Sequence, residues 1–174
     1  VVMLHGLGVL KKNQWGFTLI EVIVAIVITS IIGVGVTMAI SQVFNVNALS
    51  NNRITAVKQL ENAIYWLNRD AQMAQIVQPN GDAGFPLNLS WVEWDNTTHQ
   101  VSYTLEDSEL HRNHSINGSE PIQNVVATHI NSDVDMTNCQ FISGVFTFKV
   151  TASVSGFRSI NETHVAQVVP RSAL

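Results

Sequence analysis

Charged side chains are nearly absent from a long early part of this 174-residue chain. Between Phe17 and Asn52 the only charged residue is Glu21. Over the whole chain 13% of the residues are charged and 46% are hydrophobic, and the charges gather from Arg53 onward. A long run without charge is typical of a segment that crosses a membrane.

Cysteine residues and clusters of basic residues are also scarce, which excludes an intrachain disulfide and the usual features of a nucleic-acid-binding protein. Cys139 is the single cysteine, so no intrachain disulfide can form, and a lone cysteine of this kind is expected to be a small buried apolar residue. Basic residues form no cluster beyond Lys11-Lys12, and the formal net charge is −4. The chain therefore lacks the electrostatic footprint of a nucleic-acid-binding protein, and we predict no nucleic acid among its partners.

The apolar run predicts one membrane-spanning helix. Val22 to Ile40 are 19 uncharged residues, which would extend about 28 Å as a helix, close to the thickness of a bilayer's hydrocarbon core. Lys11-Lys12 precede the run, and no basic residue follows it until Arg53. The positive-inside rule therefore places the amino end in the cytoplasm and the remainder outside it.

Glu21 is out of place at the start of this run. An acidic side chain in hydrocarbon costs on the order of 2.5–3.5 kcal/mol even on a lenient insertion scale, so such a residue is a functional candidate whose partner has to be found. Its position in the first helical turns is favourable, because the helix macrodipole stabilises negative charge there.

The hexapeptide Gly16-Phe17-Thr18-Leu19-Ile20-Glu21 follows a short basic leader and precedes some twenty apolar residues. It resembles the processing signal of type IV pilins and type II secretion pseudopilins. The resemblance implies that prepilin peptidase removes residues 1–16, cuts between Gly16 and Phe17, and methylates the new amino group of Phe17. It also implies that Glu21 pairs with the terminal amine of a neighbouring subunit during filament assembly. The alternatives are a carboxylate that only reaches the membrane interface, or one that pairs with its own amine.

Two other fates of the amino-terminal segment stay open. Thr37-Met38-Ala39 is an acceptable small-x-small site for signal peptidase, whose cut after Ala39 would release an exported soluble binding domain. The length of the apolar run and the presence of Glu21 disfavour this alternative. The other is an uncleaved bitopic membrane protein.

Beyond the span, the pattern predicts an amphipathic continuation of the helix over residues 41–78, ended by Pro79 and the following Asn-Gly. Apolar residues three and four apart form its stripe: Ile54, Val57, Leu60, Ile64, Leu67, Ala71 and Ala74. The segment 80–174 then alternates between apolar and polar residues, as in Leu87, Leu89 and Trp91, which predicts an antiparallel sheet.

The predicted fold class is α+β. It has a long N-terminal helix, whose first half (17–40) spans the membrane, packed on a small antiparallel β-sheet head at 80–174. A head of this size buries little surface alone, so the second half of the helix is expected to complete its core. Trp91 and Trp94 are expected on opposite faces of one strand, with one of them exposed.

Candidates for catalysis or metal binding are weak. His111 and His114 are expected to be a solvated pair that faces different ways at a strand end. Asn131, Asp133 and Asp135 are similar to part of a calcium loop, but the glycine and distal glutamate of an EF-hand are missing. No nucleophile-elbow motif is present. We predict a structural protein without catalysis or cofactor.

Three features place the chain within the family that it resembles. The segment from Leu67 to Gln72 looks like the Arg-Asp segment of minor subunits of the J and W kind. Met38 stands in the neighbourhood where many major pilins have a helix-bending proline. The single Cys139 excludes the disulfide-closed loop of many major pilins. The resemblance thus implies a minor subunit, stored in the inner membrane with its head outside the cytoplasm and joined to other subunits through its N-terminal helix. The sequence leaves open a pilus, a secretion system or a DNA-uptake apparatus.

Overall fold

A computed structural model describes residues 16–156 and 158–171, so nearly all of the expected leader lies outside the described part. In these ranges the chain forms one helix, α1 (Leu19–Met73), followed by eight strands. The chain divides into two compact units, residues 1–44 and 45–174.

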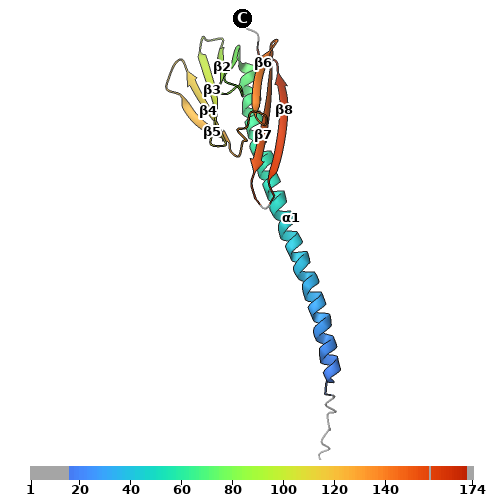
Figure 1. Cartoon of the computed structure of the whole chain (residues 1–174). Helices are drawn as coiled ribbons and strands as arrows, with labels where there is room; N and C mark the ends of the chain where they lie inside the picture. The colour runs from blue at the N-terminus through green and yellow to red at the C-terminus, as the bar shows by residue number, and fades with distance from the viewer. Residues whose placement is uncertain (1–15, 157, 172–174) are drawn as a thin grey trace, which may run out of the picture. The chain divides into compact units, whose positions relative to one another are not determined.

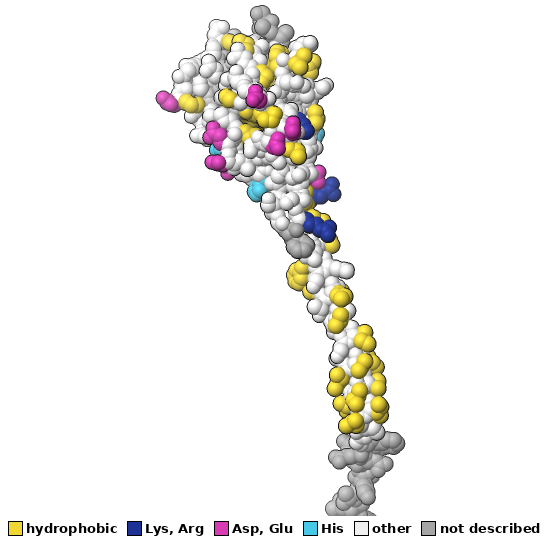
Figure 2. All heavy atoms as spheres, in the orientation of Figure 1, with side chains coloured by type: hydrophobic (Ala, Val, Ile, Leu, Met, Phe, Trp, Pro, Cys, Tyr) yellow, Lys and Arg dark blue, Asp and Glu magenta, His cyan; other side chains and the backbone are white. Residues whose placement is uncertain are grey.

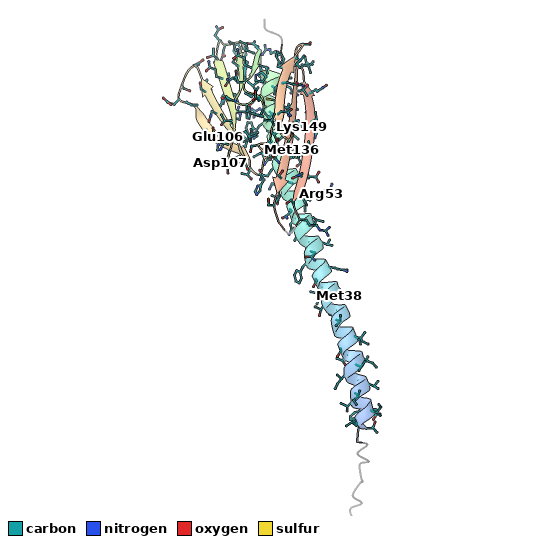
Figure 3. All side chains as sticks on the ribbon, viewed as in Figure 1. Met38, Arg53, Glu106, Asp107, Met136 and Lys149 are labelled. Carbon is teal, nitrogen blue, oxygen red and sulfur yellow. The ribbon has the colours of Figure 1, made fainter. Side chains whose placement is uncertain are left out.

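The part of α1 in the first unit is apolar on every side. An 18-residue window of the helix has a mean hydropathy of 2.7 with none of its residues buried, so the helix is long and apolar enough to cross a membrane. Figure 2 shows hydrophobic side chains crowded over this segment. Its hydroxyl groups bond to carbonyl groups one turn earlier, as Thr29 does to Ala25 at 2.7 Å and Ser30 does to Ile26 at 2.8 Å. Such internal bonds suit hydrocarbon, where polar groups find no water. The helix continues without a break through Met38 (Figure 3).

The end of the helix corrects one predicted boundary. We expected α1 to reach Gln78, but it ends at Met73, and β1 (Ile76–Pro79) follows. The Gln75 N–H already donates to the Ser90 carbonyl at 2.9 Å. Apolar residues such as Ile76 and Val77 fit both the periodicity of a helix and that of a strand. Antiparallel pairing with β2 decides in favour of the strand.

The first sheet is an antiparallel meander in the order β1-β2-β3-β4-β5. Its remaining strands are β2 (Leu87–Val92), β3 (Thr98–Glu106), β4 (Glu109–Ile116) and β5 (Ile122–Ala127). The predicted alternation is confirmed in β2, where Leu87, Leu89 and Trp91 are buried. Asp107 and Ser108 both have positive φ, 50° and 64°, as the tightest hairpin turns between right-handed twisted strands require.

A second sheet was not predicted from the sequence. It consists of β6 (Asn138–Ile142), β7 (Val145–Val154) and β8 (Ile160–Val168), also antiparallel. The two sheets meet where β1 lies near β6. In β7, Phe146 and Phe148 are fully buried, so this sheet contributes its largest side chains to the same core.

The carboxyl-terminal part of α1 completes the core of the second unit, as expected. Buried helix residues join both sheets in one apolar cluster: Ala56, Leu60, Ala63, Leu67 and Ala71. Figure 1 shows this part of the helix, in green, alongside the strands. The predicted stripe was partly wrong, because Ile54 is 62% exposed while Ala56 and Ala63 are fully buried. The buried face is lined with alanine, whose small side chain lets the helix backbone approach the strands.

Leu67→Ala is expected to lower the free energy of unfolding by about 2–5 kcal/mol, because it leaves a cavity in this core. Ile54→Ala removes an apolar side chain from the same helix at an exposed position, so its effect should stay within about 0.5 kcal/mol. Chemical denaturation of the two variants measures both values. Equal losses would contradict the assignment of the buried face.

Candidate functional site

The amino-terminal end of α1 holds the residues singled out by the sequence. Gly16 and Phe17 precede the helix in a non-helical segment, and Phe17 is 86% exposed. Glu21 lies in the first helical turn. The structure therefore places the expected cleavage point and the expected assembly residue within one short stretch of chain.

Thr18 and Glu21 form a capping box. Glu21 Oε2 accepts hydrogen bonds from the Thr18 backbone N–H at 2.8 Å and the Thr18 hydroxyl at 2.9 Å. The Glu21 N–H donates in return to Thr18 Oγ1 at 3.3 Å. This reciprocal arrangement satisfies backbone donors that a helix start otherwise leaves without partners. The signal was present in the sequence as Thr-x-x-Glu, but sequence reasoning missed it.

The capping box gives Glu21 a partner in its own helix, Thr18, which is neither of the alternatives considered for this carboxylate. Both hydrogen bonds that Thr18 donates to Glu21, one from its backbone N–H and one from its hydroxyl, reach Oε2. Within the described ranges, no hydrogen bond is formed to Oε1. One oxygen of the carboxylate can therefore cap the helix while the other accepts a hydrogen bond from another group.

A second polar cluster lies inside the head, around Asp70. This residue of α1 is only 2% exposed and is held bidentately by Arg112 of β4, with Nε donating to Oδ2 at 2.6 Å and Nη2 to Oδ1 at 3.1 Å. The hydroxyl of Tyr103, from β3, also donates to Oδ2 at 2.6 Å. The guanidinium carbon of Arg112 lies 4.8 Å from the centroid of the Trp66 ring. A buried charge is tolerated when it is paired and hydrogen-bonded in this way.

The environment fixes the protonation of this cluster. Burial and the neighbouring charge of Asp70 raise the pKa of Tyr103 far above its usual value, so the phenol remains a donor. Burial disfavours the charge on Arg112, but its hydrogen bond and attraction to Asp70 outweigh burial and raise its pKa. Sequence reasoning named the Arg-Asp segment but did not foresee that Asp70 is buried.

Three rings stack beside the cluster. The centroids of Trp91 and His99 are 5.0 Å apart, and those of His99 and His114 are 5.2 Å apart. His99 Nδ1 lies 3.0 Å from His114 Nε2, at hydrogen-bond distance. The prediction of a solvated pair was therefore wrong for His114, whereas His111 lies 3.5 Å from Glu109. Partial burial, the charge of Arg112 and the nearby His99 lower the pKa of His114.

The candidate calcium loop is organised by its own hydrogen bonds. Asn131 Oδ1 accepts from the Asp133 N–H at 2.9 Å, and Asp133 Oδ1 accepts from the Asp135 N–H at 3.0 Å. The Lys149 ammonium donates to the Asp135 carbonyl at 2.6 Å, and Figure 3 shows Lys149 beside Met136. A fixed positive charge there disfavours a cation. Among the described residues, no group of three or more His, Cys, Asp or Glu is placed to hold a metal ion.

Cys139 and Trp94 complete the set of residues singled out above. Cys139 is buried, as expected, and its thiol donates to the Gly84 carbonyl at 3.1 Å. Burial raises the pKa of the thiol to about 12, which keeps it from forming the reactive thiolate. Trp94 is 93% exposed, but it lies beyond the end of β2 at Val92, so its exposure does not follow from strand alternation.

Comparison with known proteins bears on this site. Residues 11–37 match the prokaryotic N-terminal methylation motif, a range that contains Gly16, Phe17 and Glu21. The chain is also similar to type II secretion system protein J of Vibrio cholerae serotype O1, with 33% identity over 85 residues. That match covers 48% of this chain and 38% of the relative. No solved structure matches. The motif and the relative together support the family of pilins and pseudopilins.

Arg112→Met is expected to lower the free energy of unfolding by about 3–5 kcal/mol, because it leaves Asp70 buried without its counter-charge. The double variant Asp70→Asn with Arg112→Met should recover much of that loss, because the amide is neutral and still accepts from Tyr103. Urea denaturation of the three proteins measures the difference. A single-variant loss below about 1 kcal/mol, the range of an exposed pair, would contradict a buried ion pair.

The lowered pKa of His114 predicts a dependence of stability on pH. Because the unfolded chain binds this proton more readily than the folded one, stability is constant above the unfolded pKa of about 6.5 and falls as the pH drops below it. The fall in Tm between about pH 7.5 and about pH 5 should therefore be smaller in His114→Gln than in the wild type. An identical fall in both proteins would assign the effect to other groups.

Proposed function

We propose that this chain is a structural minor pilin or pseudopilin, processed by prepilin peptidase between Gly16 and Phe17 and methylated on Phe17. It then assembles through α1 into a type IV pilus or a secretion or competence pseudopilus. The observation that carries the proposal is the methylation motif over residues 11–37, which falls in an apolar segment whose one charged residue between Phe17 and Asn52 is Glu21.

The local structure around the cleavage point supports this processing. Gly16 and Phe17 are exposed and non-helical, which is the state that a peptidase needs to bind a backbone and cut it. Lys11-Lys12 on the amino-terminal side favour a cytoplasmic leader, so the subunit is held in the inner membrane with its head on the far side. Prepilin peptidase and other pilin or pseudopilin subunits are then its partners.

Glu21 has two roles in this proposal. Before assembly, its carboxylate caps the first turn through Thr18, so the charge is not left without donors in or near the hydrocarbon. Cleavage creates a positive amine on Phe17 of every subunit. During assembly, the amine of a neighbouring subunit pairs with Glu21, whose Oε1 lies outside the capping box. The capping bond and the intersubunit pair are compatible, because they use different oxygens.

A minor subunit of the J kind is the favoured member. The similarity to type II secretion system protein J supports it, although the match spans well under half of that relative. The segment from Leu67 to Gln72 supports it as well, because it resembles the Arg-Asp segment of such subunits. Met38 in an unbroken helix agrees with a subunit that lacks the proline bend. A secretion pseudopilus is therefore favoured over a pilus.

Replacing Glu21 separates its two roles. Glu21→Gln keeps an acceptor for the Thr18 cap but has no charge, whereas Glu21→Ala removes both. If the pair with the neighbour's amine drives assembly, both variants should accumulate in the membrane and fail to enter filaments. Immunoblots of sheared filament and membrane fractions measure the partition. Wild-type incorporation of Glu21→Gln would show that capping alone is needed.

Mass spectrometry of the amino-terminal peptide, taken from the native cells, is the control for processing. The expected terminus is a methylated Phe17 in the wild type and in both variants. A chain that starts at Ile40 would instead identify an exported domain cut by signal peptidase after Ala39. An intact leader would identify an uncleaved membrane protein.

A further inference from the structure

The outer face of the first sheet, turned away from the core, is hollowed. Strands β1 to β4 form the floor of this outer hollow, and the loop before β5 forms one wall with Gly118, Ser119 and Pro121. Its volume is about 660 Å³, within the range of pockets that hold small molecules. All of its residues belong to the second unit of the chain, so the outer hollow has no part in the assembly role proposed above.

A row of polar side chains crosses the floor of the outer hollow. Gln78, Asn88, Ser102 and Asn113 lie directly opposite one another on four successive strands. Directly opposed residues of an antiparallel sheet point to the same face, with their Cβ atoms about 4.5–5.5 Å apart. The row therefore presents three amides and one hydroxyl, side by side, to the outer hollow.

A second row lies beside the first. It consists of Ser90, Gln100 and Ser115, and it begins at the apolar Ile76 of β1. Within the described ranges, no polar side chain of either row forms a hydrogen bond to another protein group. The floor thus keeps its full capacity to donate and to accept hydrogen bonds.

Charge is missing from the outer hollow. None of the described residues that line it is charged, although Glu106 and Glu109 oppose each other at the far end of β3 and β4. A solvated protein surface commonly consists of about 25–35% charged residues. A charged ligand would lose hydration in the outer hollow and would find no counter-charge there. The lining therefore favours a neutral ligand.

Macromolecular partners fit this lining poorly. Protein interfaces are depleted in serine and take most of their binding energy from Trp, Tyr and Arg, none of which lines the outer hollow among the described residues. Nucleic acid needs cations for its phosphates, and these are absent from the same lining. A neutral molecule with many hydroxyl groups does fit, because each hydroxyl can donate to an amide oxygen and accept from an amide N–H.

We propose that the outer hollow binds a neutral saccharide. The amides of Asn88 and Asn113 stand on strands separated by β3, so they can bond to hydroxyl groups on different parts of one ligand. Ile76 and Pro121 belong to opposite sides of the sheet and offer apolar contacts to the C–H faces of the sugar rings. A merely solvated sheet face would instead bind no saccharide at all.

The test follows the side-chain amide resonances of the full chain, labelled with ¹⁵N and held in micelles of dodecylphosphocholine, a detergent without a sugar headgroup. Maltotriose, cellotriose and triacetylchitotriose are titrated separately, and Asn88→Ala and Asn113→Ala identify the two resonances. The expected result is a saturable shift of both resonances with at least one of the three. A non-saturating response to all three trisaccharides, as for a solvated surface, overturns the proposal.

The two variants also locate the site. Each should weaken the apparent affinity by about fivefold, the effect of losing neutral hydrogen bonds of roughly 1 kcal/mol in total. Asn124→Ala removes an exposed amide of β5 that does not line the outer hollow, so this matched control should leave the affinity unchanged. Saturable binding that neither Asn88→Ala nor Asn113→Ala weakens would place the ligand elsewhere and overturn the proposal.

Two further probes test the class of ligand. Trigalacturonate has carboxylates on its sugar rings and should bind at least about tenfold more weakly than the best neutral trisaccharide, because the outer hollow has no counter-charge. The blocked peptide acetyl-Gly-Ser-Gly-amide is neutral but is not a sugar, and it should produce no saturable shift. Tighter binding of either probe than of every neutral trisaccharide would assign the outer hollow to an acidic ligand or to a polypeptide, and the proposal would fail.

Discussion

The burial of Asp70 against Arg112 and Tyr103 is the interaction on which the arrangement of the head depends. Apolar contacts along α1 are non-directional, and alanines such as Ala63 and Ala71 would pack nearly as well after a small shift. The carboxylate does not tolerate such a shift, because a displacement by one turn would leave a buried charge without its donors. The ion pair therefore fixes the register of the helix on β3 and β4, while the alanines set how closely it approaches.

Glu21 and Asp70 lie on the same helix and meet the same physical requirement in different ways. Each carboxylate interrupts an apolar pattern, and each is held by hydrogen-bond donors, Asp70 inside the core of the head and Glu21 at the start of the apolar segment. Asp70 finds them in side chains from distant strands, which fold around it. Glu21 finds them in its own first turn, through Thr18, and needs no other part of the chain. This difference suits a segment that is to exist first in a membrane and later, under the proposed function, among neighbouring subunits.

The sequence predicted those features that depend on local periodicity. The long apolar helix, the alternation of Leu87, Leu89 and Trp91, and the buried state of Cys139 were all predicted correctly. The predicted end of α1 is too late in the sequence. Ile76 and Val77 fit the periodicity of a helix as well as that of a strand, and only pairing with β2 decides between the two. The division into two sheets escaped prediction for the same reason, since it depends on which strands pair.

The residues that were misjudged owe their environment to contacts across long separations in sequence. Ile54 continues the helical stripe, yet it remains 62% exposed although the neighbouring Arg53 already pairs with Glu162 of β8, so Ile54 lies on a face of the helix that the strands leave uncovered. The strand position of His114 alone predicts a solvated side chain, whereas its ring stacks on His99 of the neighbouring strand. Thr18 differs from these residues, because its capping box with Glu21 is a local pattern that can be recognised in the sequence. Its recognition changes the interpretation of Glu21, since a carboxylate with one oxygen engaged and one open can hold the helix start and still receive a neighbour's amine.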